Sequence, residues 1–103
     1  MYTILRTEKA DIQIRNIVYY IANDSGSVER VLGVLDMLEK KIGMLAEQPY
    51  CAPKARHTEL RRAGFRVLVA GRYLVFYKIR ESDQTVLIYA VTDCRQDYTD
   101  LVL

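Results

Sequence analysis

The stretch from Phe65 to Tyr98 reads FRVLVAGRYLVFYKIRESDQTVLIYAVTDCRQDY, and it decides the fold of the chain. Three β-rich runs, residues 65–70, 73–79 and 85–91, are separated by residues that favour turns. Gly71 permits a tight reversal between the first two runs. A polar Ser-Asp pair favours a local turn between the second and third. The stretch therefore predicts a three-stranded antiparallel meander.

Two helices are predicted ahead of this meander. The first follows Thr7, a suitable N-cap, and ends near residues 23–24, just before Gly26. Ser27 can cap the second helix, which is expected to end at Pro49 because proline disfavours a helical conformation of its predecessor. The connection between the helices is short, so the pattern predicts an antiparallel helical hairpin.

The second helix carries the clearest periodic signal in the chain. A continuous apolar stripe alternates steps of three and four residues, which is typical of a buried helix face. Its members are Val28, Val31, Leu35, Leu38, Ile42 and Leu45. A flanking stripe consists of Val34, Met37 and Met44. It either widens the buried face or leaves a groove open for a partner helix, since methionine suits adaptable binding surfaces.

These elements combine into an α+β fold of β-α-α-β-β-β order. A short β-like segment, residues 2–5, precedes the helices, and residues 48–64 are expected to form a loop. The helical hairpin should pack on one face of a mainly antiparallel sheet, giving two layers. The apolar tail, residues 99–103, is expected to fold back on a single domain spanning residues 1–103.

Composition limits the classes of function. The chain has 103 residues, half of them hydrophobic, and no apolar run near the roughly 20 residues that a membrane span needs. No signal peptide is visible, and Cys51 and Cys94 are expected to be free thiols in a reducing cytoplasm. Because His57 is the sole histidine, no zinc site, metal or cofactor is expected.

Positive charge is concentrated in one segment. Residues 54–72 hold six Lys or Arg residues against Glu59 alone, although the net charge of the chain is only +2. Such a cluster is a footprint for phosphate or for an acidic protein partner. The structural alternative is a solvated loop and edge strand, where positive charges discourage aggregation.

No standard catalytic constellation is present. The sequence contains no Gly-rich phosphate loop and no Ser-His-Asp arrangement. Metal-free cleavage of RNA stays possible on residue types alone, because arginine and lysine can clamp a phosphate while a lysine or tyrosine moves protons.

The order of elements and three motifs resemble the RelE/ParE superfamily of bacterial toxins. The motifs are residues 11–21 of the first helix, residues 73–77 of the middle strand, and the ending 93–101. The resemblance implies the toxin of a type II toxin–antitoxin pair, held in a hetero-oligomer with its cognate antitoxin. RelE-like members cleave messenger RNA on the ribosome, whereas ParE-like members bind DNA gyrase and block replication.

The resemblance carries over to single residues unevenly. RNase members usually place arginine where this chain has Leu74, and many have a histidine or an aromatic residue at the position of Asp93. Arg66 and Arg95 match basic positions of the family, and Tyr98 approximately matches the catalytic tyrosine. A nuclease would therefore rely on Arg66, Arg72, Arg95 and Tyr98. Target or phosphate binding would fall to Lys54, Arg56, Arg61 and Arg62, and antitoxin binding to Val34, Met37 and Met44.

Each of these assignments has a structural alternative. Arg95 could form a salt bridge to Asp93 or Asp97, Tyr98 could pack over the sheet edge, and Arg66 could be an exposed strand residue. The sequence favours a ParE-like toxin of DNA gyrase. The alternatives are a RelE-like, ribosome-dependent and metal-independent endoribonuclease, and a non-toxic nucleic-acid-binding module.

Overall fold

The computed structural model describes residues 1–96 and 102. Within this part, the strands are β1 (Thr3–Arg6), β2 (Arg66–Ala70), β3 (Tyr73–Arg80) and β4 (Thr85–Asp93). The α-helices are α1 (Glu8–Ser25), α2 (Val28–Gly43) and α3 (Thr58–Arg62). Short 3₁₀ turns, Met44–Ala46 and Glu81–Asp83, follow α2 and β3.

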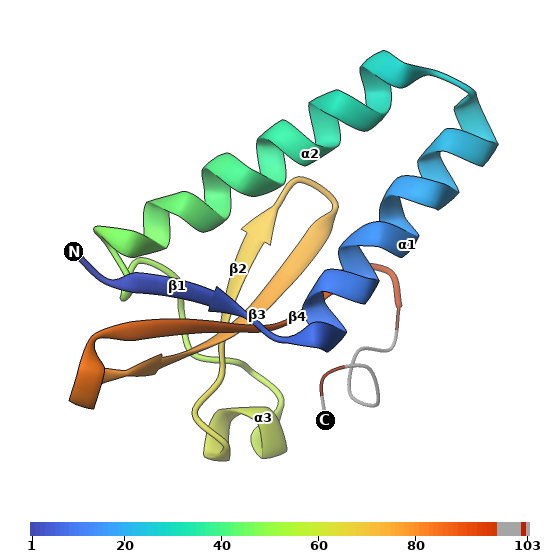
Figure 1. Ribbon diagram of the computed structural model, residues 1–103. Coiled ribbons are helices and arrows are strands. Elements are labelled where there is room, and N and C mark those ends of the chain that lie inside the picture. The colour runs from blue at the N-terminus through green and yellow to red at the C-terminus, as the bar shows by residue number, and fades with distance from the viewer. Residues whose placement is uncertain (97–101, 103) are drawn as a thin grey trace.

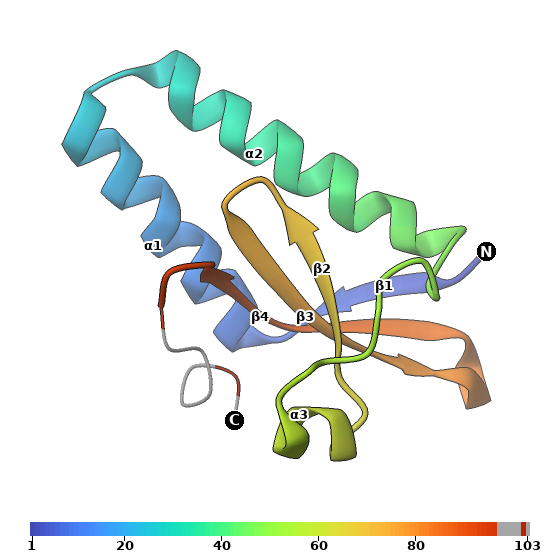
Figure 2. The ribbon, with the colours of Figure 1, turned by 180° about the vertical axis from the view of Figure 1, so that it is seen from behind.

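The strands form one sheet in the order β1-β4-β3-β2. The pairs β2–β3 and β3–β4 are antiparallel, which confirms the predicted meander, and β1 runs parallel to β4. The hairpin of α1 and α2 lies on one side of the sheet, and α3 lies at its other side (Figures 1 and 2). The predicted two-layer α+β fold is therefore confirmed.

The helix ends form where the sequence predicts them. The Thr7 hydroxyl accepts a hydrogen bond from the Ala10 amide at 3.1 Å, so it caps α1. At the other end, Gly26 adopts a left-handed conformation with φ of 63°. Ser27 then caps α2 through a 3.3 Å bond from the Arg30 amide. These caps satisfy amides that the helices leave unpaired at their starts.

Successive side chains of β3 point to opposite faces of the sheet, and each face carries its own core cluster. Tyr73, Val75 and Tyr77 belong to the larger cluster, which packs under the helical hairpin. Phe76 belongs to a second cluster on the opposite face, with Leu74 packed against it. Both faces of the central strand are thus apolar, as expected for a strand covered on both sides.

The region before β2 differs from the prediction. Residues 48–64 are not a continuous loop, because α3 occupies positions 58–62. Leu60 of α3 is fully buried in the second cluster, and its carbonyl accepts a 3.0 Å hydrogen bond from the Phe65 amide. Helix α2 also ends earlier than predicted, at Gly43, and a 3₁₀ turn continues it to Ala46.

The β2–β3 turn gives a sharp test of the packing under α2. Gly71 has a φ of 59°, and a Cβ placed there would lie 3.1 Å from Cε of Met37. We expect Gly71→Ala to lower the free energy of unfolding by about 1–2 kcal/mol, because it combines a left-handed conformation with crowding. Chemical denaturation would measure the loss.

The matched control is Gly33→Ala, in the middle of α2. A Cβ there meets nothing within 4 Å. The change should stabilise the protein by about 0.5–1 kcal/mol, since alanine favours the helix. If Gly71→Ala had no greater effect on stability than Gly33→Ala, the β2–β3 turn would not be packed closely against Met37.

Candidate functional site

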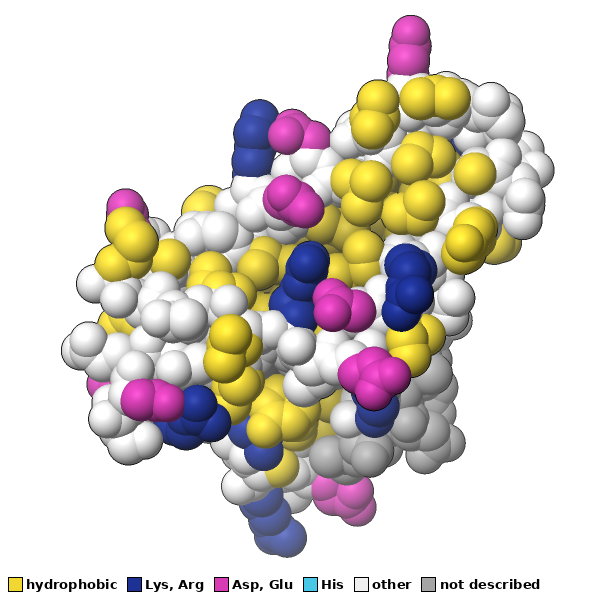
Figure 3. Space-filling view, in the orientation of Figure 1, with side chains coloured by type: hydrophobic (Ala, Val, Ile, Leu, Met, Phe, Trp, Pro, Cys, Tyr) yellow, Lys and Arg dark blue, Asp and Glu magenta, His cyan; other side chains and the backbone are white. Residues whose placement is uncertain are grey.

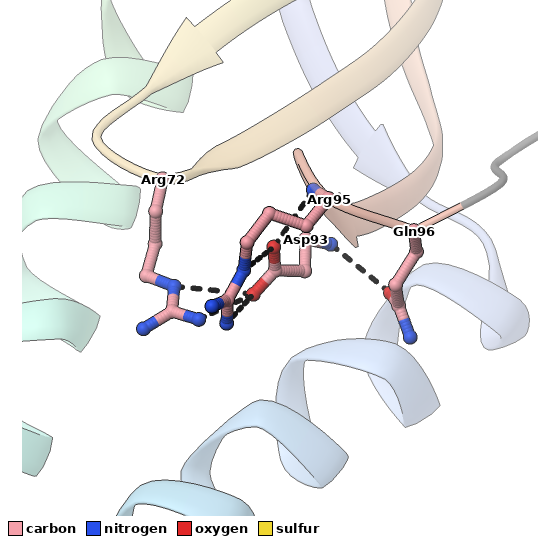
Figure 4. A network of polar contacts seen from close by, with 4 residues as sticks. All are labelled: Arg72, Asp93, Arg95 and Gln96. Carbon is pink, nitrogen blue, oxygen red and sulfur yellow. Dashed lines mark hydrogen bonds and ion pairs between the residues drawn. The ribbon is translucent and has the colours of Figure 1, made fainter.

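Two arginines meet one carboxylate at the end of the sheet nearest the β2–β3 turn (Figure 4). Arg72 donates to Oδ2 of Asp93 from Nε at 3.1 Å and from Nη2 at 2.8 Å. Arg95 approaches the same carboxylate from Nε at 3.3 Å and from Nη2 at 3.4 Å, and its backbone amide donates to Oδ1 at 2.9 Å. Arg72, Asp93 and Arg95 are called the Asp93 cluster below.

The strand register creates this cluster. Tyr73 pairs with Asp93 across β3 and β4, so Arg72, one residue earlier, emerges from the turn beside the end of β4. The Cys94 amide donates to the Arg72 carbonyl at 2.8 Å and holds the two segments together. The structural alternative for Arg95, a salt bridge to Asp93, is therefore what the structure contains.

A cleft of about 880 Å³ opens between the helical hairpin and this end of the sheet. The Asp93 cluster forms part of its rim, and Ile17, Ile21 and Val34 contribute apolar surface. Burial raises the pKa of Tyr73, which also lines the cleft, so its phenol stays neutral at physiological pH. The cleft is thus a mixed surface, suited to a protein segment with apolar and polar side chains.

The second group of cations lies at the opposite end of β2. Lys54, Arg61 and Arg66 line a pocket of about 360 Å³, which is called the basic pocket below. Arg66 begins β2 and Ala70 ends it, so the strand separates Arg66 from the Arg72 turn by roughly 13 Å. The direction of the strand therefore places Arg66 and Arg72, which are close in sequence, at opposite ends of β2.

Arg66 is half-buried, and so it is not the exposed strand residue of the structural alternative. Its Nη1 donates to the Ala52 carbonyl at 2.7 Å, and its guanidinium lies 4.9 Å from the ring centroid of Tyr50. Arg56 and Arg62 are exposed and lie outside the lining of the basic pocket. Tyr98 lies outside the described residues.

The sheet face opposite the hairpin is apolar where RNase members of the superfamily would carry arginine. Leu74 packs there against the second core cluster, together with Val67 and Tyr89. Lys78 lies near these residues, with its Nζ 4.6 Å from the ring centroid of Phe65 and 5.0 Å from that of Tyr89. Lys9 also reaches this cluster, because its Nζ donates to the Val102 carbonyl at 3.2 Å. This face therefore offers aromatic and aliphatic contacts beside the ammonium groups of Lys78 and Lys9.

The residues expected to bind the antitoxin divide into two kinds. Val34 and Met37 are partly buried and pack against the main core, which supports the wider buried face for these two. Met44 is 43% exposed.

Other apolar residues project from the far half of the helical hairpin, where hydrophobic side chains gather in Figure 3. Val28 is 71% exposed, although its stripe predicted burial, because the hairpin extends beyond the sheet. Sequence reasoning also missed Tyr19, Tyr20 and Leu32, which are 65%, 64% and 59% exposed. Helical periodicity could not identify them, because it shows which residues share a helix face but not how far the sheet extends along the helix.

Metal and membrane features can be assessed for residues 1–96 and 102. No group of three or more His, Cys, Asp or Glu side chains in this part could hold a metal ion. No helix in the same part is long and apolar enough to cross a bilayer. Cys51 and Cys94 are both exposed free cysteines.

Comparison with known proteins gives consistent results. A family model described as the ParE toxin of type II toxin–antitoxin systems matches residues 4–98. The structure is similar to a chain of the toxin–antitoxin complex RelBE2 from Mycobacterium tuberculosis, with 25% identity and a TM-score of 0.62, covering 89% of this chain and 96% of that chain. It also resembles E. coli toxin RelE, a mutant in the free state, with 18% identity and a TM-score of 0.63, covering 97% and 88%. The second likeness supports the fold alone, and no curated protein sequence matches.

Proposed function

The chain belongs to the ParE toxin family of type II toxin–antitoxin systems, and we propose that this toxin inhibits growth by acting on DNA gyrase. It is thus the toxin of a module whose other member is a cognate antitoxin. The choice of target within the RelE/ParE superfamily depends on whether the chain has the parts of a nuclease.

The observation that carries the proposal is the apolar packing of Leu74. A nuclease needs cations beside the scissile phosphate, and RNase members supply an arginine at this position. Here Leu74 packs into an apolar cluster beneath α3. Losing one charged contact to the transition state typically lowers the rate by about 10²–10³-fold.

The remaining arginines add to this argument. The Asp93 carboxylate accepts hydrogen bonds from both Arg72 and Arg95. A phosphate bound there would therefore meet a negative charge between the two guanidinium groups. Arg66 is bonded to the Ala52 carbonyl at the far end of β2. These contacts support a protein-binding toxin, for which the exposed apolar hairpin tip offers contact area.

The second candidate is a ribosome-dependent messenger RNA endonuclease. In its favour, Arg66 and Arg95 match in sequence two basic positions of the RNase members of the superfamily. The non-toxic binding module is the weaker reading, since the family found is a toxin family.

The experiment compares the two targets directly. Purified toxin, freed from its antitoxin, is added to gyrase and relaxed plasmid, and messenger RNA from induced cells is mapped by primer extension. We expect inhibition of supercoiling and intact RNA. Adding the antitoxin in excess should restore supercoiling and growth.

Leu74→Arg sharpens the comparison. In a nuclease this change should raise RNA cleavage, and Arg95→Ala or Tyr98→Phe should abolish it. Under the gyrase proposal none of the three variants changes RNA integrity. Ribosome-positioned cuts by the wild-type toxin, with supercoiling unaffected, would contradict the proposal.

A further inference from the structure

The basic pocket has an unusually one-sided charge. Its lining contains Lys54, Arg61 and Arg66 and no Asp or Glu. Among the described residues, none of these three cations forms an ion pair. Arg72 and Arg95 differ from these three cations, because both form ion pairs with the Asp93 carboxylate. Three cations around one pocket repel one another, and an incoming anion would relieve that repulsion.

The fold fixes the Arg66 side chain and orders the backbone that carries Lys54 before any ligand arrives. Arg66 is fixed by its bond to the Ala52 carbonyl and by its stacking over Tyr50. The segment carrying Lys54 is tied to the sheet, because Lys54 forms a β-bridge with Arg66 and the Ala55 amide donates to the Phe65 carbonyl at 2.9 Å. Such order lowers the entropic cost of binding.

Arg61 is positioned in the same way. It lies in the last turn of α3, next to Leu60, which is fully buried in the second core cluster. Apolar side chains, Phe65 and Ile79, complete the lining of the basic pocket. The pocket therefore combines cations carried on an ordered backbone with an apolar wall, which suits a carboxylate on an aliphatic stem.

We propose that the basic pocket receives an Asp or Glu side chain of the cognate antitoxin. The proposal concerns the partner and not the target, so it rests on family membership and is independent of the action on gyrase. Because the basic segment gives this toxin its positive charge, an acidic partner residue gains most by inserting here.

A protein carboxylate fits better than a nucleic-acid backbone. A duplex needs a stripe of cations, since it presents one phosphate per roughly 3.4 Å along each strand. Here the pocket gathers only three cations at one end of β2. Two exposed acids lie close to it: Glu59 is on α3 with Arg61, and Glu81 contacts Tyr50, whose pKa is raised by burial and by its hydrogen bond to Glu81. A polyanion would be repelled by both acids, whereas a single side chain avoids them.

The test uses two double variants that each remove two positive charges from residues 54–62. Lys54→Gln/Arg61→Gln removes two of the three cations of the pocket, and Arg56→Gln/Arg62→Gln removes two exposed charges outside it. The Kd for the purified antitoxin encoded beside the toxin gene is measured at two salt concentrations. We expect the first double variant to weaken binding at least tenfold and the second less than threefold.

Other results would overturn the proposal. Equal weakening by both double variants would mean that only the general field of the segment matters, and no weakening would mean that the pocket is not a contact. A third result concerns binding to a 20-nucleotide single-stranded DNA. If the wild-type toxin bound this DNA, and Lys54→Gln/Arg61→Gln lost DNA binding but kept its affinity for the antitoxin, the pocket would be assigned to phosphate instead.

A charge swap gives a positive test. Each Asp and Glu of the antitoxin is replaced by Lys in turn, and each product is combined with Lys54→Glu. Recovery of at least tenfold in affinity for one pairing would support direct contact, and recovery for none would count against it. A loss of gyrase inhibition in Lys54→Gln/Arg61→Gln, with antitoxin affinity unchanged, would overturn the proposal and assign the pocket to the target.

Discussion

Replacing Tyr77 by alanine is expected to cause the largest loss of stability, about 4 kcal/mol. Tyr77 is fully buried in the middle of β3, and its hydroxyl donates to the Pro49 carbonyl at 2.7 Å. Truncating a buried aromatic ring leaves a cavity and typically costs about 3–5 kcal/mol. For a domain of this size the thermal midpoint should fall by more than about 12 °C, which calorimetry would detect.

The control is Tyr77→Phe. It keeps the ring but leaves the Pro49 carbonyl without its partner, so the expected loss is only about 1 kcal/mol. Burial raises the pKa of Tyr77 to about 12, in line with a phenol that stays protonated as a structural donor. If alanine and phenylalanine had equal effects, the ring would not be the packing element described above.

Phe65→Ala should give the second-largest effect, about 3–4 kcal/mol, and should also weaken the basic pocket. Phe65 is 3% exposed, and its ring meets that of Tyr89 edge-on at a centroid distance of 5.1 Å. It joins α3 to the second core cluster and contributes to the lining of the basic pocket. Losing it should free α3 and lower antitoxin affinity along with stability.

Phe65→Leu separates the two consequences. Leucine fills most of the cavity, so the loss of stability should be about 1 kcal/mol, and antitoxin affinity should stay within threefold of wild type. Urea denaturation and the antitoxin binding assay measure the two effects. Full affinity in a destabilised Phe65→Ala would show that the pocket does not need α3 held against the sheet.

Much of the fold could be predicted because its signals are local. Caps such as Thr7 and Gly26 act within a few residues, and the turn at Gly71 joins strands that are neighbours in sequence. The short helix α3 could not be predicted, since five residues show no period. Its position depends on Leu60 being buried against residues that come later in the chain.

The site was less predictable than the fold, for a related reason. The residue types were visible, but which arginines meet depends on strand direction. Arg66 and Arg72 are close in sequence yet lie at opposite ends of β2. Arg72 and Asp93 are far apart in sequence yet pair because Tyr73 stands opposite Asp93. With the register in hand, the Asp93 cluster could have been deduced before any side chain was placed.

The parallel pairing of β1 with β4 has a consequence for synthesis. Residues 3–6 find their neighbour only after residues 85–88 have been translated. β1 therefore joins the sheet only after the other strands have been made, and pairing over such a separation is slow to form. A polypeptide released early by a premature stop codon lacks β4 and has no partner for its first strand. Such a fragment cannot complete the sheet, and its unpaired first strand should leave it open to proteolysis.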